Sequence, residues 1–204
     1  MGLWNLKEFK NKCLNKGLDK AWFYTGSLAF KWNAVKYHRG KIEDKLAEMK
    51  EKPIPQIAAI YDYEIAFDLD CLMTTLNSIW DILGQLLNEF YVIPKKNPGE
   101  VCFNTIIKDK SIPATIRNIL LSIKGDTLYA TILAYANVSK HRHSIEGENL
   151  IDMSDKPYKV SYNSIEYEYN GKWYKLTTDK AFKCMEFVGN SVDQVGARIH
   201  ELLK

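Results

Sequence analysis

The sequence predicts a mainly α-helical protein, an up-down helical bundle with a small antiparallel β meander inserted before the last helix. Long segments repeat apolar residues at helical spacing, and 46% of the 204 residues are hydrophobic. One stretch, residues 156–176, alternates apolar and polar residues instead. A chain of this length buries a sizeable core. We therefore expect a single domain over residues 1–204, with the meander at 156–177.

Two helices are predicted in the N-terminal part of the chain. Residues 3–16 form a short amphipathic pattern, and a longer pattern follows over residues 19–51. Asp19 is a suitable N-cap for the second helix, because its side chain accepts hydrogen bonds from free backbone N–H groups. Pro53 sets the end of this helix, since the residue before a proline avoids helical geometry.

The longest predicted helix covers about residues 55–92 and stops at the sequence KKNPGE. Its apolar positions recur at helical spacing. A second, polar pattern lies on the same helix at steps of four, three, four and seven, which place its members on one stripe. Its members are Asp70, Thr74, Asn77, Asp81 and Asn88. Such a stripe forms a structural hydrogen-bonded network or, in the case of Asn77 and Asp81, meets a basic motif across the bundle.

Two further helices precede the meander. One is expected within residues 111–125, with Ser111 as N-cap and Gly125 as stop, and the next runs from about 127 to 143. In the meander, Asn170-Gly171 is a hairpin turn signal, and Asn163-Ser164 is a second predicted turn, which follows a third strand at 158–162. A final helix is expected over 179–203. About six predicted helices with one small sheet favour a helical bundle.

The charge alternates along the chain although the net charge is only +3. Residues 54–93 contain six acidic residues and neither Lys nor Arg, whereas the segments on both sides are basic. This pattern indicates helices with complementary faces or simply solvated surfaces. The small net charge by itself does not indicate nucleic-acid binding.

The four cysteines and the first residues of the chain limit which classes of protein are compatible with the sequence. Cys71 and Cys184 lie in apolar contexts and are expected in the core, and no C-x-x-C pair predicts a zinc site. The start MGLWNLKEFK has no apolar signal region, and no segment reaches the length of a membrane span. We therefore expect a cytoplasmic protein that needs no metal and no cofactor and does not associate with membranes.

The candidate functional site is the stretch AYANVSKHRHSI, residues 134–145. It places four basic or titratable residues at the end of an apolar helix: Lys140, His141, Arg142 and His143. Asn137 and His141 are four residues apart and share a helix face. An imidazole transfers protons near neutral pH, and adjacent cations favour its neutral, proton-accepting form and attract phosphate. Cations at a helix C-terminus are also favourable for purely structural reasons.

A long helical hairpin followed by a helix ending in Asn-x-x-Lys-His-Arg resembles bacterial members of the HEPN superfamily (higher eukaryote and prokaryote nucleotide-binding). The matching residues are Asn137, Lys140, His141 and Arg142, and the segment DILGQLLNEF, residues 81–90, resembles the acid-bearing helix before the motif. The resemblance covers about residues 55–145. It implies a helical bundle, frequently a homodimer with a shared cleft, and in many members a metal-independent ribonuclease of defence or toxin–antitoxin systems.

Carried over to this chain, the resemblance assigns the general acid/base to His141 and phosphate binding to Lys140 and Arg142. Asn137 then positions the helix or the substrate. Independently of the resemblance, His143, Asp81 and Asn77 are candidate substrate-binding residues. The expected partners are a second copy of the chain, RNA, and an antitoxin or other protein.

One departure from the family pattern concerns an arginine. The usual signature has Arg four to six residues before His, and no Arg occupies positions 134–138. Two alternatives follow. The remaining cations suffice to polarise a phosphate, or the fold serves as a catalytically inactive module for dimerisation or protein interaction.

Two roles are possible for the tyrosines of the meander, and none is predicted for two of the histidines. The tyrosines of the meander either stack nucleic-acid bases or fix the hairpin onto helices. They are Tyr162, Tyr167, Tyr169 and Tyr174. His38 and His200 are isolated in the sequence, and no role is assigned to either of them.

Overall fold

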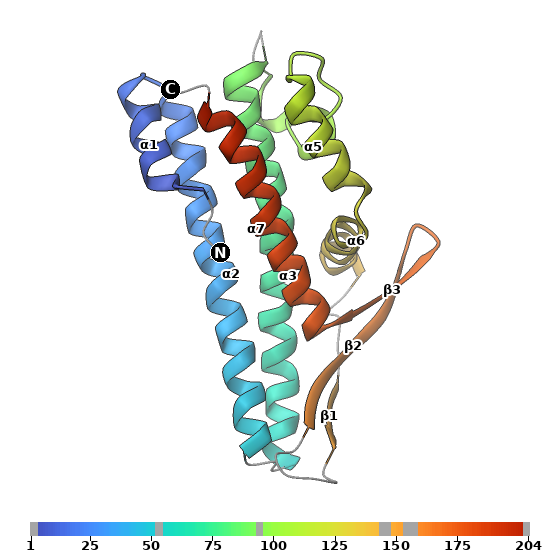
Figure 1. The fold of residues 1–204 in the computed structure, drawn as a ribbon. Helices are drawn as coiled ribbons and strands as arrows, with labels where there is room; N and C mark the ends of the chain where they lie inside the picture. The colour runs from blue at the N-terminus through green and yellow to red at the C-terminus, as the bar shows by residue number, and fades with distance from the viewer. Residues whose placement is uncertain (1–3, 52–54, 93–95, 143–147, 153–158, 202–204) are drawn as a thin grey trace. The chain divides into compact units, whose positions relative to one another are not determined.

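A computed structural model gives the architecture, and it describes residues 4–51, 55–92, 96–142, 148–152 and 159–201. Along 55–59, 141–142, 148–152 and 159–166 it describes the backbone alone. The elements in chain order, traced in colour in Figure 1, are α1 (Leu6–Asn15), α2 (Asp19–Glu51), α3 (Pro55–Tyr91), a 3-10 turn (Pro98–Glu100), α4 (Phe103–Ile106), α5 (Ala114–Gly125), α6 (Thr127–Arg142), β1 (Glu148–Asp152), β2 (Lys159–Tyr169), β3 (Lys172–Thr177) and α7 (Thr178–Glu201). The predicted fold class is confirmed: the chain is mostly helical, with a small antiparallel sheet before the last helix.

Gly17 separates α1 from α2. Its φ of +67° lies in the left-handed region, which glycine adopts without a steric penalty. The N–H of Leu18 donates to the carbonyl of Cys13, and the N–H of Gly17 donates to that of Leu14. This pair of bonds is a Schellman motif, which satisfies the last carbonyls of α1 and reverses the chain into α2.

The connection after α3 contains structure that the sequence did not predict. The side chain of Asn88 donates to the carbonyl of Lys96 and accepts from its N–H, so it closes the connection back onto α3. The one-turn helix α4 follows at Phe103–Ile106. The prediction that Ser111 caps the next helix was wrong. Ser111 instead bonds Asp109 through its N–H and its hydroxyl, and α5 begins after Pro113.

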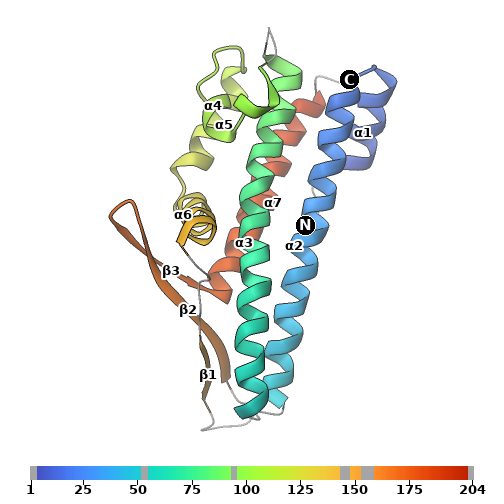
Figure 2. The ribbon, with the colours of Figure 1, turned by 180° about the vertical axis from the view of Figure 1, so that it is seen from behind.

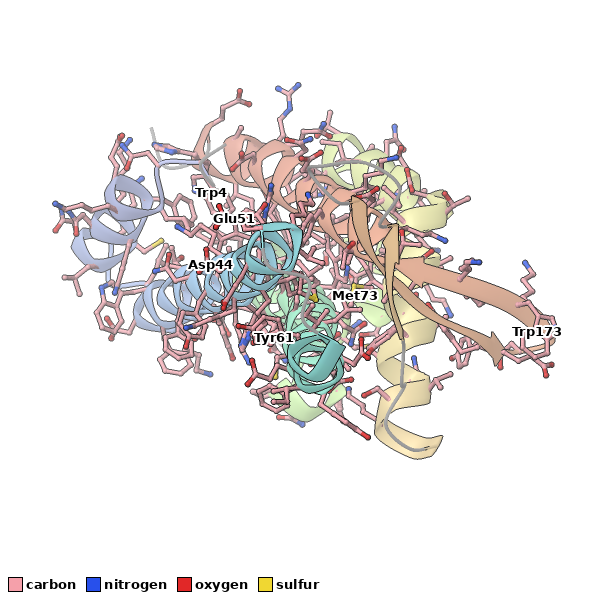
Figure 3. All side chains as sticks on the ribbon, turned by 90° about the horizontal axis from the view of Figure 1, so that it is seen from below. Trp4, Asp44, Glu51, Tyr61, Met73 and Trp173 are labelled. Atoms are coloured by element: carbon pink, nitrogen blue, oxygen red, sulfur yellow. The ribbon has the colours of Figure 1, made fainter. Side chains whose placement is uncertain are left out.

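The sheet has the order β1-β2-β3 with antiparallel pairs, as Figures 1 and 2 both show. Asn170 and Gly171 both have positive φ, at 51° and 72°, which identifies a type I′ turn. The predicted pairs Tyr169–Lys172 and Tyr167–Tyr174 are present.

The predicted turn at Asn163-Ser164 was wrong. Strand β2 continues through these two residues, and the ladder with β3 is irregular between Asn163 and Glu166. The predicted pair of Ile165 and Leu176 falls at this irregularity. The third strand lies earlier in the chain than expected, at Glu148–Asp152. An irregular ladder position absorbs a polar pair inside a strand without ending it.

The contacts cluster into two compact units. Unit 1 comprises residues 1–33, 76–130 and 186–204, and unit 2 comprises residues 34–75 and 131–185. Four helices contribute residues to both units: α2, α3, α6 and α7. The expectation of a single domain stays a prediction.

The core of unit 1 is rich in aromatic rings. The indole of Trp80 packs 5.3 Å from the ring of Phe103, 5.8 Å from Tyr129 and 5.9 Å from Phe187, centroid to centroid. Burial, with the Asp81 carboxylate as the next contribution, raises the pKa of Tyr129 to about 12. Aromatic pairs at these separations add to the stabilisation that burial alone provides.

The two ends of the described chain meet in unit 1. Trp4 is packed so closely against Gly196 that a Cβ there would lie 1.8 Å from the indole. The ring of Phe9 is 5.9 Å from that of His200, and the ammonium of Lys12 donates to Nε2 of His200 at 2.8 Å. Helix α1 is thereby packed against the last turns of α7.

In unit 2 the sheet is fixed to α6 by tyrosines. The hydroxyl of Tyr167 donates to the carbonyl of Thr131 at 3.2 Å. The ring of Tyr167 packs edge-on against Tyr135 and stacks on Tyr174. Burial raises the pKa of Tyr167 far above its usual range. Tyr167 and Tyr174 therefore attach the hairpin to a helix, which was one of the two predicted roles.

Candidate functional site

The predicted basic motif occupies the last two turns of α6, which ends at Arg142. The side chains of Asn137 and Lys140 are described, whereas His141 and Arg142 are described by their backbone alone. His143 lies outside the described residues. The helix therefore extends through the predicted Asn-x-x-Lys-His-Arg segment, as expected.

The two described side chains of the motif differ in exposure. Asn137 is half-buried, and its Nδ2 donates to the carbonyl of Leu133 at 2.7 Å, one turn earlier in the same helix. Lys140 is exposed. An exposed ammonium in the last turn of a helix interacts favourably with the helix dipole and remains free to bind an anion. The side chain of Asn137 therefore bonds within its own helix, whereas that of Lys140 is exposed to solvent.

Ser139 anchors the same turn of α6 to α3. Its hydroxyl donates to the carboxylate of Asp70, a member of the predicted polar stripe. Successive residues of an α-helix are about 100° apart around its axis, so position 137 lies about 160° from position 139. Position 141 follows 137 by four residues and shares its face. The motif positions 137 and 141 are therefore on the side of α6 opposite the bond to α3.

Most members of the polar stripe of α3 make hydrogen bonds within the protein, as a structural role requires. Thr74 donates its hydroxyl to the carbonyl of Asp70 at 2.7 Å, and Asn88 holds the backbone of Lys96. The carboxylate of Asp81 is exposed and accepts from the N–H of Phe103 at 3.3 Å, at the start of α4. A carboxylate at a helix N-terminus is stabilising.

Asn77 and Asp81 were also predicted to reach the basic motif. Asn77 is half-buried. Both residues belong to unit 1, whereas residues 137–142 belong to unit 2. Their contact with the motif stays a prediction.

A second cluster of titratable side chains lies in unit 2, between α2 and α3. The Asp68 carboxylate accepts from Nδ1 of His38 at 2.8 Å through one oxygen and from Nζ of Lys45 at 2.5 Å through the other. Lys45 also lies 3.3 Å from Glu64. Asp68 is only 6% exposed, so this carboxylate is buried between two hydrogen-bond donors, the imidazole of His38 and the ammonium of Lys45. Buried charges persist where they are paired and hydrogen-bonded.

The cluster forms the floor of a surface pocket of about 460 Å³. Aromatic side chains line its rim: Tyr37 is 60% exposed, Tyr63 is 76% exposed and Phe67 is 65% exposed. Lys41 also lines the pocket, with its ammonium 5.6 Å from the centre of the Tyr37 ring. Concave sites that combine aromatic walls with a few fixed polar groups are typical ligand sites.

No role was predicted for His38, although the sequence contains two signals for this cluster. His38 and Lys45 are seven residues apart on α2, and Glu64 and Asp68 are four apart on α3. Each pair therefore shares a helix face. The basic and acidic segments around Pro53 indicated complementary faces, and the contacts of Lys45 with Glu64 and Asp68 confirm this locally.

The four cysteines are free thiols. Cys184 is buried, as predicted, and Cys71 is half-buried. Burial raises the pKa of the Cys13 thiol to about 11, so this thiol is unreactive. The described part of the chain contains no group of three or more His, Cys, Asp or Glu side chains arranged to hold a metal ion.

None of the helices in the described ranges combines the length and apolar character that crossing a bilayer requires.

Comparisons with known proteins do not assign the chain to a family. No protein-family model, no curated protein and no solved structure matches it.

Proposed function

We propose that this protein is a HEPN-like, cytoplasmic RNA-binding protein that cleaves RNA through the last turn of α6, as part of a bacterial defence or toxin–antitoxin type system. The observation that carries the proposal is the placement of residues 137–142. They end a helix that Ser139 anchors to Asp70, and they include the exposed Lys140. A cationic helix end on a fixed element is a suitable phosphate-binding group.

The reaction that fits these residue types is an internal transesterification. His141 accepts the proton of a ribose 2′-hydroxyl, the 2′-oxygen forms a bond to the adjoining phosphorus, and the bond from phosphorus to the 5′-oxygen breaks. The leaving 5′-oxygen takes up a proton. Lys140 and Arg142 stabilise the negative charge that develops on the phosphoryl oxygens, and the products carry 2′,3′-cyclic phosphate and 5′-hydroxyl ends. A homodimer would bring two copies of the motif to one cleft.

The test incubates the full chain with labelled single-stranded RNA in the presence of EDTA. We expect 2′,3′-cyclic phosphate ends with the unmodified protein, and a loss of about 10²-fold or more in rate with His141→Ala. The helical circular-dichroism signal of this variant should equal that of the unmodified protein. Intact RNA with the unmodified protein, or unchanged cleavage with His141→Ala, would overturn the assignment.

A matched pair of lysine variants tests the phosphate contact. Lys140→Ala should weaken RNA binding and lower its salt dependence, because fewer counterions are released. Lys124→Ala removes an exposed lysine from the last turn of α5 and should leave both unchanged.

One observation favours a second function, a catalytically inactive module for dimerisation or for binding an antitoxin-type partner. Large apolar side chains are exposed on the helices, among them Phe23 at 61% and Phe30 at 71%. These two line a surface pocket of about 580 Å³ in unit 1 together with Trp22. Exposed apolar patches mark interaction surfaces. A stable dimer that neither binds nor cleaves RNA would support this function over the first.

A further inference from the structure

The pocket between α2 and α3 in unit 2 shares no residue with the motif on α6. Helix α2 contributes Tyr37, His38, Lys41 and Lys45, and α3 contributes Tyr63, Glu64, Phe67 and Asp68. These residues combine exposed aromatic rings, a hydrogen-bonded imidazole and cationic side chains within one concave surface. A ligand can therefore bind in this pocket whether or not residues 137–142 have any activity.

The floor of the pocket fixes the orientation of one imidazole. Asp68 is an acceptor only, so the Nδ1 of His38 carries the proton of their 2.8 Å hydrogen bond. The lone pair of the neutral imidazole is then on Nε2. Within the described part of the chain, Nε2 of His38 has no hydrogen-bond partner. The ring is thus held in place by one nitrogen and available to a ligand through the other.

The two lysines of the pocket differ in what offsets their charge. Lys45 is bound by Asp68 at 2.5 Å and by Glu64 at 3.3 Å, so carboxylates already offset its charge. Lys41 is exposed and has no carboxylate within ion-pair distance among the described residues. Its ammonium lies near the Tyr37 ring. Lys41 is therefore the cation of this pocket that is available for an anion.

The rim offers aromatic faces to a planar ligand. Tyr63 and Phe67 are four residues apart on α3 and share a face of that helix. Both are more than 60% exposed. Stacking of a nucleic-acid base on such a ring contributes about 1–3 kcal/mol per base, and it tolerates every base because all have a π-face. The exposed rings supply a stacking platform beside the cation.

We propose that this pocket binds a nucleobase together with its adjoining phosphate, with the base on Tyr63 and Phe67 and the phosphate on Lys41, in the pocket that His38 also lines. The ligand is either a free nucleotide or one residue of a single-stranded RNA. The floor of the pocket consists of hydrogen-bonded polar side chains: His38, Asp68 and Lys45. Such a floor favours this ligand over a protein partner, because the buried centre of a protein interface is depleted in charged residues. The proposal goes beyond cleavage at α6 and requires only binding.

The first experiment titrates the full chain by calorimetry with adenosine monophosphate, adenosine and inorganic phosphate. Adenosine monophosphate should bind, and each of its two parts alone should bind at least tenfold more weakly. A labelled twelve-residue single-stranded RNA forms the second arm, read by fluorescence anisotropy. If the RNA binds and adenosine monophosphate does not, the base and phosphate come from RNA. If adenosine monophosphate binds, a free nucleotide suffices. Either result supports the site.

Two matched pairs of variants locate the binding. Tyr63→Leu and Phe67→Leu should each weaken binding at least tenfold, whereas Phe30→Leu, an equally exposed ring in unit 1, should leave it unchanged. Lys41→Gln should remove the preference for the phosphorylated ligand. Lys36→Gln, another exposed lysine of α2, should not. The separation of this site from the proposed activity at α6 is read with adenosine monophosphate alone: Tyr63→Leu should lose its binding, whereas Lys124→Ala, an exposed lysine of α5, should retain it.

Three results would overturn the proposal. The first is that neither the mononucleotide nor the RNA binds to the unmodified protein. The second is that Tyr63→Leu and Phe67→Leu bind both ligands as the unmodified protein does. The third is that these variants turn a dimer into a monomer in sedimentation while ligand binding stays unchanged, because the aromatic rim is then an interface between copies of the chain.

Discussion

The hydroxyl of Ser139 on α6 donates to the carboxylate of Asp70 on α3, one residue before the exposed Lys140. The two residues are 69 positions apart in the chain, so the bond is a tertiary contact. It anchors the turn of α6 that carries the basic motif. The packing of α3 and the position of the motif therefore depend on the same pair of side chains.

Ser139→Ala is expected to destabilise the protein. Hydrogen bonds to charged groups contribute about 1.5–3 kcal/mol, and the variant leaves the half-buried Asp70 carboxylate without this donor. Urea denaturation should show a lower free energy of unfolding by that amount. Ser122→Ala on the exposed face of α5 serves as control and should change it by less than about 0.5 kcal/mol. Equal effects of the two variants would show that the bond to Asp70 is unimportant.

Gly196→Ala is expected to destabilise unit 1. The new Cβ would lie 1.8 Å from the indole of Trp4, so the indole has to leave its place. Overpacking of this kind costs about 1–3 kcal/mol. Gly40→Ala, in the middle of α2 and with no atom within 4 Å of its Cβ, should instead stabilise by about 0.5–1 kcal/mol. Thermal unfolding monitored by circular dichroism distinguishes these opposite signs, and a stabilised Gly196→Ala would contradict the close packing.

Asp109→Asn is expected to lower stability in a pH-dependent way. Side-chain hydrogen bonds from Lys96 and Ser111 lower the pKa of Asp109 to about 2 in the folded protein. Because the pKa in the unfolded chain is higher, about 3.9, the ionised carboxylate stabilises the fold above that pH. This contribution falls as the pH is lowered through the folded value.

The free energy of unfolding of the unmodified protein and of Asp109→Asn should therefore differ at pH 7 and converge near pH 2. Denaturant titrations across this range measure the difference. Glu43→Gln, which removes an exposed carboxylate of an i,i+4 pair, provides the comparison and should show a much smaller change. A constant difference at all pH values would contradict the assigned cause.

Tyr167→Phe is expected to loosen the attachment of the hairpin. The variant removes the hydroxyl that donates to the carbonyl of Thr131 and keeps the ring, which lowers the free energy of unfolding by about 1 kcal/mol. Tyr63→Phe removes a hydroxyl from a ring that is 76% exposed and should have no measurable effect. Hydrogen exchange of the β2 and β3 amides measures the local consequence, and unchanged protection would show that the bond does not hold the hairpin.

The long helices were predictable because each carries a strong local signal. The span 19–51 was predicted with the bounds that α2 has, because Pro53 sets the end of the helix. Helix α4 has only four residues, too few to show a period, and its N-terminus is completed by Asp81 from a distant part of the chain. The strand break at Asn163-Ser164 was predicted from local turn chemistry, which the ladder with β3 overrides.

Of the two candidate sites, one was predictable from local sequence and the other was not. The motif at 137–142 is local and was found because its residues are consecutive on one helix. His38 was missed because Asp68 lies 30 residues away on the neighbouring helix. The register between two antiparallel helices decides which faces meet, and a single sequence does not specify that register.

The contacts between α1 and α7 have a consequence for the order of folding. Trp4, Phe9 and Lys12 pack against Gly196 and His200, residues that a ribosome synthesises almost two hundred positions later. Phe9 also packs 5.8 Å from the ring of Phe90 on α3, but the contacts of α1 with α7 form only after α7 has emerged, so unit 1 completes its core after translation of that helix. Such long-range closure slows folding, and during synthesis the part of α1 that α7 covers remains exposed to chaperones.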